Sequence, residues 1–228
     1  MNGLKGSMPE KPRDAMKIAV FDLDRTLIKG TSAEFILIRF LKQKGMITNR
    51  NLFRMITFIF RHLEEGVEGA LFKNRAYLTG LREDEIKSML PELWRHHLLP
   101  SLSEKIVKRF RDLKKQGFYI VLLSGAIDFL LDLFHEYLEA DRAIGARAEV
   151  ENGVFTGRLL FHPYFWNKLH IFNDLISGMN VDLEESYMFA DSITDIPLLK
   201  RSGHPVAVHP KLPMYIFARS KGWPVIQP

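Results

Sequence analysis

Short apolar runs alternate with amphipathic segments along most of the chain, a pattern that predicts strands separated by helices. The runs at residues 17–21, 118–123 and 187–190 show no alternation of polar and apolar positions, so both faces of these strands should be buried. Residues 102–116 repeat their apolar positions with a helical period and end at Gly117, a typical helix stop. This order predicts an α/β fold, a Rossmann-like doubly wound and mostly parallel sheet.

The second half of the chain contains one exception to parallel pairing. Asn152-Gly153 divides residues 145–160 into two strand-like halves, which is a strong signal for a two-residue hairpin. The remaining pattern predicts helices at 128–138, 168–177, 197–201 and 215–220 and a strand at 205–208.

A block without strand-like segments follows the first strand. Its pattern predicts four helices, at residues 34–41, 52–63, 67–78 and 83–94, with Ser32 as the N-cap of the first. Inserted at this place, such a block should form a small domain over the end of the strand and is a candidate lid. We therefore predict a core domain of residues 16–30 and 100–228, a helical cap of residues 31–99, and a flexible leader of residues 1–15.

Composition narrows the class of protein. The chain has 228 residues and is 46% hydrophobic, which is enough for a sizeable packed interior. It has no cysteine, which excludes disulfides, thiolate metal sites and a cysteine nucleophile and suits a reducing compartment. The N-terminal stretch has no signal-peptide pattern, and no apolar run approaches the roughly 20 residues of a membrane span. We therefore expect a cytoplasmic protein.

The cap carries charge of one sign. The net charge of the chain is +5, and residues 35–63 contain no acidic residue. The basic residues of this stretch include Arg39, Lys42, Lys44, Arg50, Arg54 and Arg61. Three interpretations stay open: attraction of a phosphate-bearing substrate, peripheral contact with an anionic membrane, or a solvated surface with no special partner. We expect no nucleic-acid partner, and the oligomeric state stays open.

Polar side chains follow three of the predicted strands. Asp22 and Asp24 come after the first strand, Ser124 after the second, and Asp191 after the 187–190 strand, with Asp195 just beyond. Ligands of open α/β sheets bind at the carboxyl ends of the strands, so these groups should share one site. Carboxylates this close repel each other unless a cation lies between them, and Mg²⁺ is the natural guest of oxygen ligands.

These residues resemble the motifs of the haloacid dehalogenase superfamily, and within it the phosphoserine phosphatase-like subfamily, whose cap follows the first motif. Asp22-Leu23-Asp24-Arg25-Thr26 matches Asp-x-Asp-x-Thr, and Ser124 in VLLSGA matches the second motif. Lys168 is the best match for the motif lysine, with Lys200 and Lys114 as competitors, and FADSITDIPLL matches the acidic fourth motif. The resemblance extends from Lys17 to the end of the chain.

The resemblance implies a Mg²⁺-dependent phosphatase that works through an aspartyl-phosphate. Asp22 would be the nucleophile and Asp24 the acid and base. The ion would be held by Asp22, the main-chain carbonyl of Asp24 and Asp191. In the same scheme, Ser124 and Lys168 would hold phosphate oxygens, Asp195 would orient the ligands, and Thr26 would support the turn.

The substrate is less well defined than the reaction. By analogy with cap residues of phosphoserine phosphatases, Glu34 and Arg75 are candidates for substrate contact, and Gly125 is a further one. Ala190 and Ser192 stand where phosphoserine phosphatases usually have glycines, and Thr194 where they have an asparagine. Arg25 stands where a small residue is common, and these departures weaken the case for phosphoserine itself. The leading hypothesis is a phosphomonoesterase for a small phosphorylated metabolite. The alternatives are a phosphotransferase or lipid-phosphate phosphatase at a membrane surface, and a non-catalytic phosphate-binding module.

Overall fold

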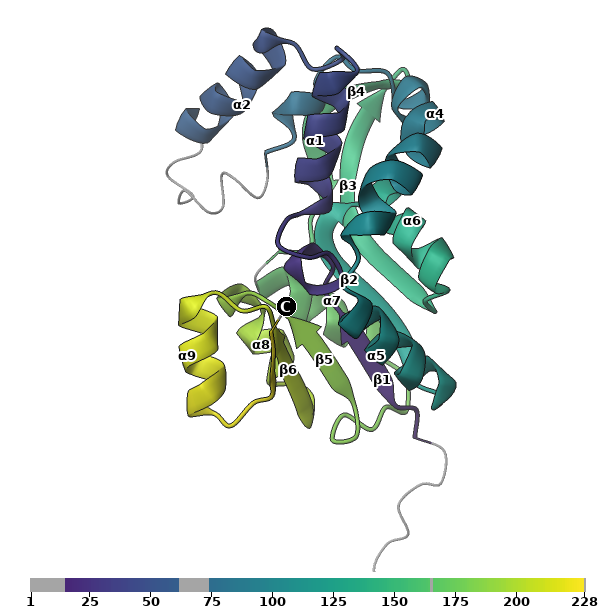
Figure 1. Cartoon of the computed structure of the whole chain (residues 1–228), viewed down its shortest axis with the longest axis vertical. Coiled ribbons are helices and arrows are strands. Elements are labelled where there is room, and N and C mark those ends of the chain that lie inside the picture. Colours follow the sequence, from purple (N-terminus) through teal and green to yellow (C-terminus); the bar gives the residue numbers. More distant parts are fainter. Residues whose placement is uncertain (1–14, 62–73, 165, 228) are drawn as a thin grey trace, which may run out of the picture.

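A seven-stranded sheet forms the centre of the described part of the chain, which in this computed structural model comprises residues 15–61, 74–164 and 166–227. Its strands are β1 (Ile18–Phe21), β2 (Tyr119–Ile127), β3 (Arg142–Glu151), β4 (Val154–Phe161), β5 (Tyr187–Ala190), β6 (His204–Val208) and β7 (Val225–Ile226). Their order is β4-β3-β2-β1-β5-β6-β7, and all neighbours are parallel except β3 and β4. The predicted fold class, a doubly wound and mostly parallel α/β sheet, is confirmed (Figure 1).

Helices cover both faces of the sheet. The helices are α1 (Ala33–Gln43), α2 (Asn49–Arg61), α4 (Glu83–Leu93), α5 (Glu104–Lys115), α6 (Asp128–Leu138), α7 (Trp166–Ile176), α8 (Ile196–Leu199) and α9 (Leu212–Ser220). Shorter helical turns are η1 (Leu23–Leu27), η3 (Ala76–Leu78), η4 (Trp94–Leu98), η5 (Leu99–Ser101) and η6 (Ile193–Asp195). One buried cluster joins a face of the sheet to α5 and α6, and a second joins the other face to α7, α8 and α9.

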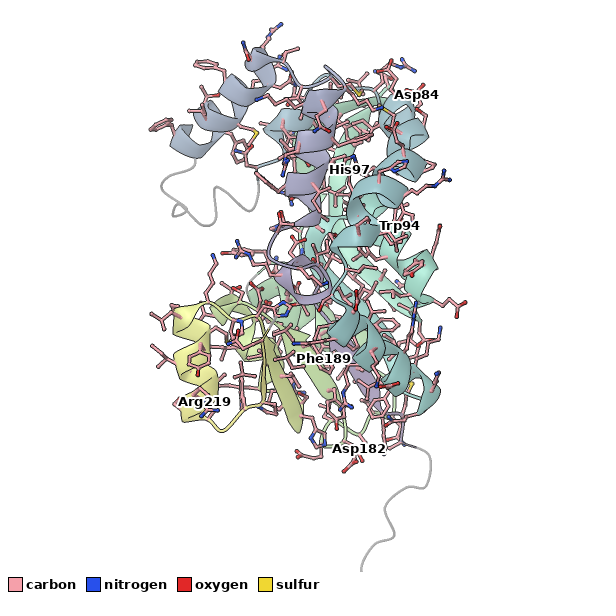
Figure 2. All side chains as sticks on the ribbon, in the orientation of Figure 1. Asp84, Trp94, His97, Asp182, Phe189 and Arg219 are labelled. Atoms are coloured by element: carbon pink, nitrogen blue, oxygen red, sulfur yellow. The ribbon has the colours of Figure 1, made fainter. Side chains whose placement is uncertain are left out.

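The central strand β1 has apolar side chains on both faces because helices cover both. All four of its residues are buried, and Phe21 stacks on Phe189 of β5 with ring centroids 4.4 Å apart. Figure 2 shows Phe189 within this packed region of the sheet. The chain runs from β1 to β2 and β3 on one side and through β5, β6 and β7 on the other, so the strand order reverses beside β1. Ligands bind at such a switch point in open α/β sheets.

Local sequence signals determine several turns as expected. The Ser32 side chain accepts a hydrogen bond from the Phe35 backbone N–H at 3.1 Å, which confirms it as the N-cap of α1. Asn152 and Gly153 have φ angles of 50° and 77°, the left-handed pair that a two-residue hairpin requires. The β3–β4 hairpin therefore forms where the sequence predicts it.

Two predicted elements differ from the structure. The third cap helix was expected at residues 67–78; residues 62–73 lie outside the described range, and residues 74–78 contain only the turn η3. The Asn74 side chain accepts from the Ala76 N–H at 3.1 Å, a local bond that competes with helix formation. Strand β2, expected to end before Ser124, continues to Ile127 with an irregular register.

The hairpin supports the helical block that precedes it in the chain. The Gly80 N–H donates to the Phe155 carbonyl and the Phe155 N–H to the Leu81 carbonyl, both at 2.9 Å. Gly157 leaves room for this contact, because a Cβ there would lie 2.2 Å from the Thr79 hydroxyl oxygen. The predicted division into a core and a cap (residues 31–99) stays a prediction, and the leader at residues 1–14 lies outside the described range.

Candidate active site

The carboxyl ends of β1, β2 and β5 meet beside a cavity of about 550 Å³, at the predicted edge of the sheet. Every predicted site residue except Thr26 lines it. These residues are Asp22, Asp24, Glu34, Arg75, Ser124, Gly125, Lys168, Asp191 and Asp195. Residues that are far apart in the sequence thus surround one volume, with β-strand ends on one side and cap residues on the other.

Lys168, near the start of α7, is the cation nearest the carboxylates. Its Nζ lies 2.8 Å from Asp22 Oδ1 and 2.9 Å from Asp195 Oδ1, and all three side chains are buried. Burial by itself would lower the pKa of Lys168, but the carboxylates of Asp195 and Asp22 raise it above its usual value, so the lysine stays charged.

The competing lysines of the sequence are engaged elsewhere. Lys114 pairs with Glu139, and the Lys200 ammonium lies 5.5 Å from the centre of the Phe217 ring. Neither lines the cavity. Among the three candidates, only Lys168 reaches the site.

The carboxylates outnumber the cations around them. Asp22, Asp191 and Asp195 each offer a carboxylate oxygen, and these oxygens lie within 4.8 Å of one another. Burial raises the pKa of Asp22 and of Asp191 to about 7, with repulsion from neighbouring carboxylates adding to the effect. Oxygen-only ligands, burial and excess negative charge together suit a hard divalent cation such as Mg²⁺.

Asp24 has a different environment from Asp22. It lies in the turn after β1, and its Oδ1 accepts a hydrogen bond from the Ala33 N–H at 2.9 Å, at the start of α1. Burial raises its pKa to about 7, although the Ala33 bond opposes this. A carboxyl group with a pKa near neutrality can both give and take a proton, as an acid–base catalyst must.

Arg25 and His209 are site features that sequence reasoning did not assign. Arg25 has a left-handed φ of 58°, and its guanidinium lies 3.8 Å from Asp191 Oδ2. The His209 Nδ1 lies 3.1 Å from the Arg25 carbonyl oxygen and fixes this turn against the loop after β6. A non-glycine residue in the left-handed region is a signal that only the backbone can reveal.

The remaining motif side chains are buried around the same turn and strand end. The Ser124 hydroxyl accepts from the Ala126 N–H at 3.3 Å; Ser124 lies within β2 and not after its end as predicted, yet it lines the cavity. The Thr26 side chain is buried behind the cavity, and within the described residues its hydroxyl has no hydrogen-bond partner. Its packing is consistent with the predicted support of the turn.

The helical segments that precede β2 contribute a buried polar wall. Arg75 Nε lies 2.6 Å from Glu34 Oε1, the Tyr77 hydroxyl donates to Glu34 at 2.8 Å, and an Arg75 amine donates to the Gly125 carbonyl at 2.9 Å. Burial raises the pKa of Glu34, whereas Arg75 and the Tyr77 hydroxyl lower it. The two cap residues predicted to contact substrate therefore lie together, and they connect the cap to β2.

Related sequences and solved structures match most of this chain. A family model described as haloacid dehalogenase-like hydrolase matches residues 19–200. A protein named for inhibition of morphological differentiation in Streptomyces azureus is 28% identical, with 94% of this chain and 78% of the relative covered. Phosphoserine phosphatase SerB1 of Mycobacterium tuberculosis is 25% identical, covering 96% and 73%. A Bordetella pertussis protein of unknown function has the same fold, with a TM-score of 0.78, 24% identity and coverage of 94% and 99%.

Proposed function

The chain belongs to the haloacid dehalogenase-like hydrolases, and from this premise we propose that it hydrolyses phosphomonoesters through a phosphorylated Asp22. The observation that carries the proposal is the meeting of Asp22, Ser124, Lys168 and Asp191 around one cavity. A nucleophile, donors for phosphate oxygens and a cation-binding carboxylate are what phosphoryl transfer requires. The phosphatase named among the relatives supports the same reaction class.

The first half-reaction needs Asp22 in its ionised form. The Lys168 ammonium, 2.8 Å away, favours that form, and Mg²⁺ held by Asp22, Asp191 and the main-chain carbonyl of Asp24 would supply further positive charge near the phosphoryl oxygens. The Asp22 carboxylate attacks phosphorus as the bond to the leaving oxygen breaks. Asp24 gives its proton to that oxygen, so the alcohol departs neutral.

The second half-reaction reverses the role of Asp24. Its carboxylate takes a proton from water, the water oxygen attacks phosphorus, and the bond to Asp22 breaks, which releases inorganic phosphate. Ser124 and Lys168 hold the phosphate oxygens in both steps, and Asp195 holds Lys168 in place at 2.9 Å. The pKa of about 7 for Asp24 suits both transfers near neutral pH.

In this proposal the leaving group of the substrate contacts the cap. Its polar part would lie beside Glu34 and Arg75, and Gly125 would face it from β2. The cavity of about 550 Å³ suits a small phosphorylated molecule or the polar head of a larger one. We further propose that residues 31–99 act as a cap that shields the reaction from bulk water.

The test is phosphate release from p-nitrophenyl phosphate with Mg²⁺ and with EDTA. We expect release only with Mg²⁺, and a loss of at least about a thousandfold in Asp22→Asn, because the amide cannot attack phosphorus. Asp84→Asn is the matched control, since Asp84 is exposed at the outer end of the molecule (Figure 2) and does not line the cavity. Equal turnover by Asp22→Asn, or full turnover in EDTA, would overturn the proposal.

A further inference from the structure

Most of the exposed large hydrophobic side chains among the described residues lie on segments that border the cavity. Those on cavity-lining residues or on α2 and α9, two of the helices that contribute to the lining, are Phe35, Phe53, Ile56, Phe60, Ile193, Leu212, Tyr215 and Ile216. The others among the described residues are Tyr137, Leu160, Phe161 and Met179. Scattered exposed hydrophobics are ordinary, but a group around one opening indicates a binding surface.

Helix α2 presents a complete apolar stripe to solvent. Phe53, Ile56 and Phe60 are 66%, 52% and 69% exposed, and their spacing places them on one face of the helix. Met55 lines the cavity from the other side of the helix. The stripe therefore points away from the cavity, on the outer face of a helix that borders it.

Helix α9 presents a second apolar face. Leu212 and Ile216, one turn apart, are 70% and 58% exposed, and the adjacent Pro213 and Met214 line the cavity. Figure 1 shows α2 and α9 on the same side of the molecule, one beside the cap helices and the other beside the sheet. One flat partner could contact both helices and would then cover the mouth between them.

The segments that contain α2 and α9 carry basic residues and no acidic ones. No acidic residue occurs in residues 35–63, which include α2, or in residues 196–228, which include α9. Arg50 is exposed on α2, and Lys211 lies at the rim of the cavity just before α9. Apolar stripes beside basic side chains are the pattern of helices that lie in the surface of an anionic membrane.

We propose that this mouth surface, formed by the exposed apolar residues of α2 and α9 and their basic neighbours, docks on an anionic lipid layer, and that the substrate is the phosphomonoester head of an amphiphile in that layer. The substrate part rests on the proposed function. The rim supports it, because Phe35, Ile38 and Met55 offer apolar contact where the leaving group exits towards the surface. No helix among the described residues is long and apolar enough to cross a membrane.

Binding is tested with vesicles of phosphatidylcholine, with and without phosphatidylglycerol, in low and high salt. The full chain should co-sediment with the anionic vesicles in low salt and less in high salt. Phe53→Ser/Phe60→Ser should weaken this binding by at least about tenfold, because two exposed rings no longer enter the interface. The matched control is Leu160→Ser/Met179→Ser, which removes exposed hydrophobics away from the mouth and should leave binding unchanged.

Rates of hydrolysis with lipid-like and soluble substrates distinguish an effect on membrane docking from an effect on the catalytic step. Dodecyl phosphate in anionic vesicles should be hydrolysed with a kcat/KM at least about tenfold above that of soluble butyl phosphate. Phe53→Ser/Phe60→Ser should lose this advantage and keep its turnover of p-nitrophenyl phosphate, since neither ring lines the cavity. Absence of turnover on any ester would count against the proposed function, whereas vesicle binding is measured without turnover.

Three results would overturn the docking proposal. The first is that the chain does not bind anionic vesicles in low salt, and the second is that Phe53→Ser/Phe60→Ser binds as well as the control. The third is a self-associating chain that becomes monomeric in Phe53→Ser/Phe60→Ser with no lipid binding, which would identify the face as an interface between copies. Equal kcat/KM for butyl and dodecyl phosphate would overturn the substrate class.

Discussion

Replacing Asp191 with Asn should stabilise the metal-free protein while it removes cation binding. The Asp191 side chain is only 9% exposed, its nearest cation among the described residues is Arg25 at 3.8 Å, and burial raises its pKa from 3.8 to about 7. A buried carboxylate with so little compensating charge lowers the free energy of unfolding unless a cation is bound beside it. Asn has nearly the same shape and no charge, so it avoids that cost and loses the ligand.

The size of the effect follows from the pKa. Below pH 3.8 the carboxyl group is protonated in both the folded and the unfolded chain, and it contributes nothing. Between 3.8 and about 7 only the unfolded chain loses the proton, so stability falls as the pH rises. Above about 7 the cost is complete, on the order of 4 kcal/mol at 1.36 kcal/mol per pH unit. Asp191→Asn recovers only about half of this free energy, because the N–H donors of the buried amide also need hydrogen-bond partners.

The measurement is thermal unfolding in EDTA and in excess Mg²⁺, at pH 5 and at pH 8.5. A net gain of about 2 kcal/mol corresponds to a Tm for Asp191→Asn about 4 to 8 °C above that of the wild type at pH 8.5 in EDTA. At pH 5 the charge cost is only about 1.6 kcal/mol, which does not exceed the cost of the buried amide, so the gain should vanish. Mg²⁺ should raise the Tm of the wild type and leave that of the variant unchanged.

Asp195→Asn is the control for removing one negative charge from the same group of carboxylates. Asp195 belongs to the same group of carboxylates, but it pairs with Lys168 at 2.9 Å, so its loss should destabilise the protein by about 2 kcal/mol. If Asp191→Asn were less stable than the wild type at pH 8.5 in EDTA, or if Mg²⁺ did not stabilise the wild type, the excess of negative charge at this site would be refuted.

Three further substitutions test the buried polar wall around Glu34 and the close packing before β6. Tyr77→Phe removes the hydroxyl that donates to Glu34 at 2.8 Å and should cost about 1 kcal/mol, measured as a lower midpoint in urea with an unchanged slope. Gly203→Ala would place a Cβ 2.0 Å from the Glu184 carbonyl oxygen and should cost about 3 kcal/mol or more in the same assay. Gly178→Ala, with nothing within 4 Å and strained only by its φ of 83°, should cost about 1 kcal/mol. A Gly203→Ala protein as stable as Gly178→Ala would contradict the close packing inferred there.

The sheet and the residues at its edge were predictable because their signals are local. An apolar run buried on both faces predicts a strand, and in parallel strands the residues after each carboxyl end share one edge. Asp22, Ser124 and Asp191 therefore meet as expected. The lysine of the site could be narrowed only to three candidates, Lys168, Lys200 and Lys114. The sequence of a helix does not show in which direction a lysine side chain points.

The described end of the predicted third cap helix, residues 74–78, shows where local signals fail. Residues 67–78 have a helical period, yet the described part of this segment is tied down by side chains that reach distant backbone. The Asn74 amide donates to the Met55 carbonyl at 2.8 Å, and an Arg75 amine donates to the Gly125 carbonyl at 2.9 Å. These bonds depend on how α2 and β2 are placed, so tertiary contacts override the propensity of the segment.

The same contacts explain why the substrate is harder to predict than the reaction. The carboxylates proposed to be catalytic follow strands of one sheet, whereas Glu34 and Arg75 come from different segments of the proposed cap and meet because Tyr77 and β2 hold them. Arg75 already neutralises Glu34, so the pair presents little net charge to a ligand. A leaving group that approaches this wall meets a polar but nearly neutral surface, with Phe35 and Met55 at the rim. Selectivity should therefore depend on the shape and apolar surface of the leaving group more than on its charge, which favours an amphiphile over a doubly charged amino acid.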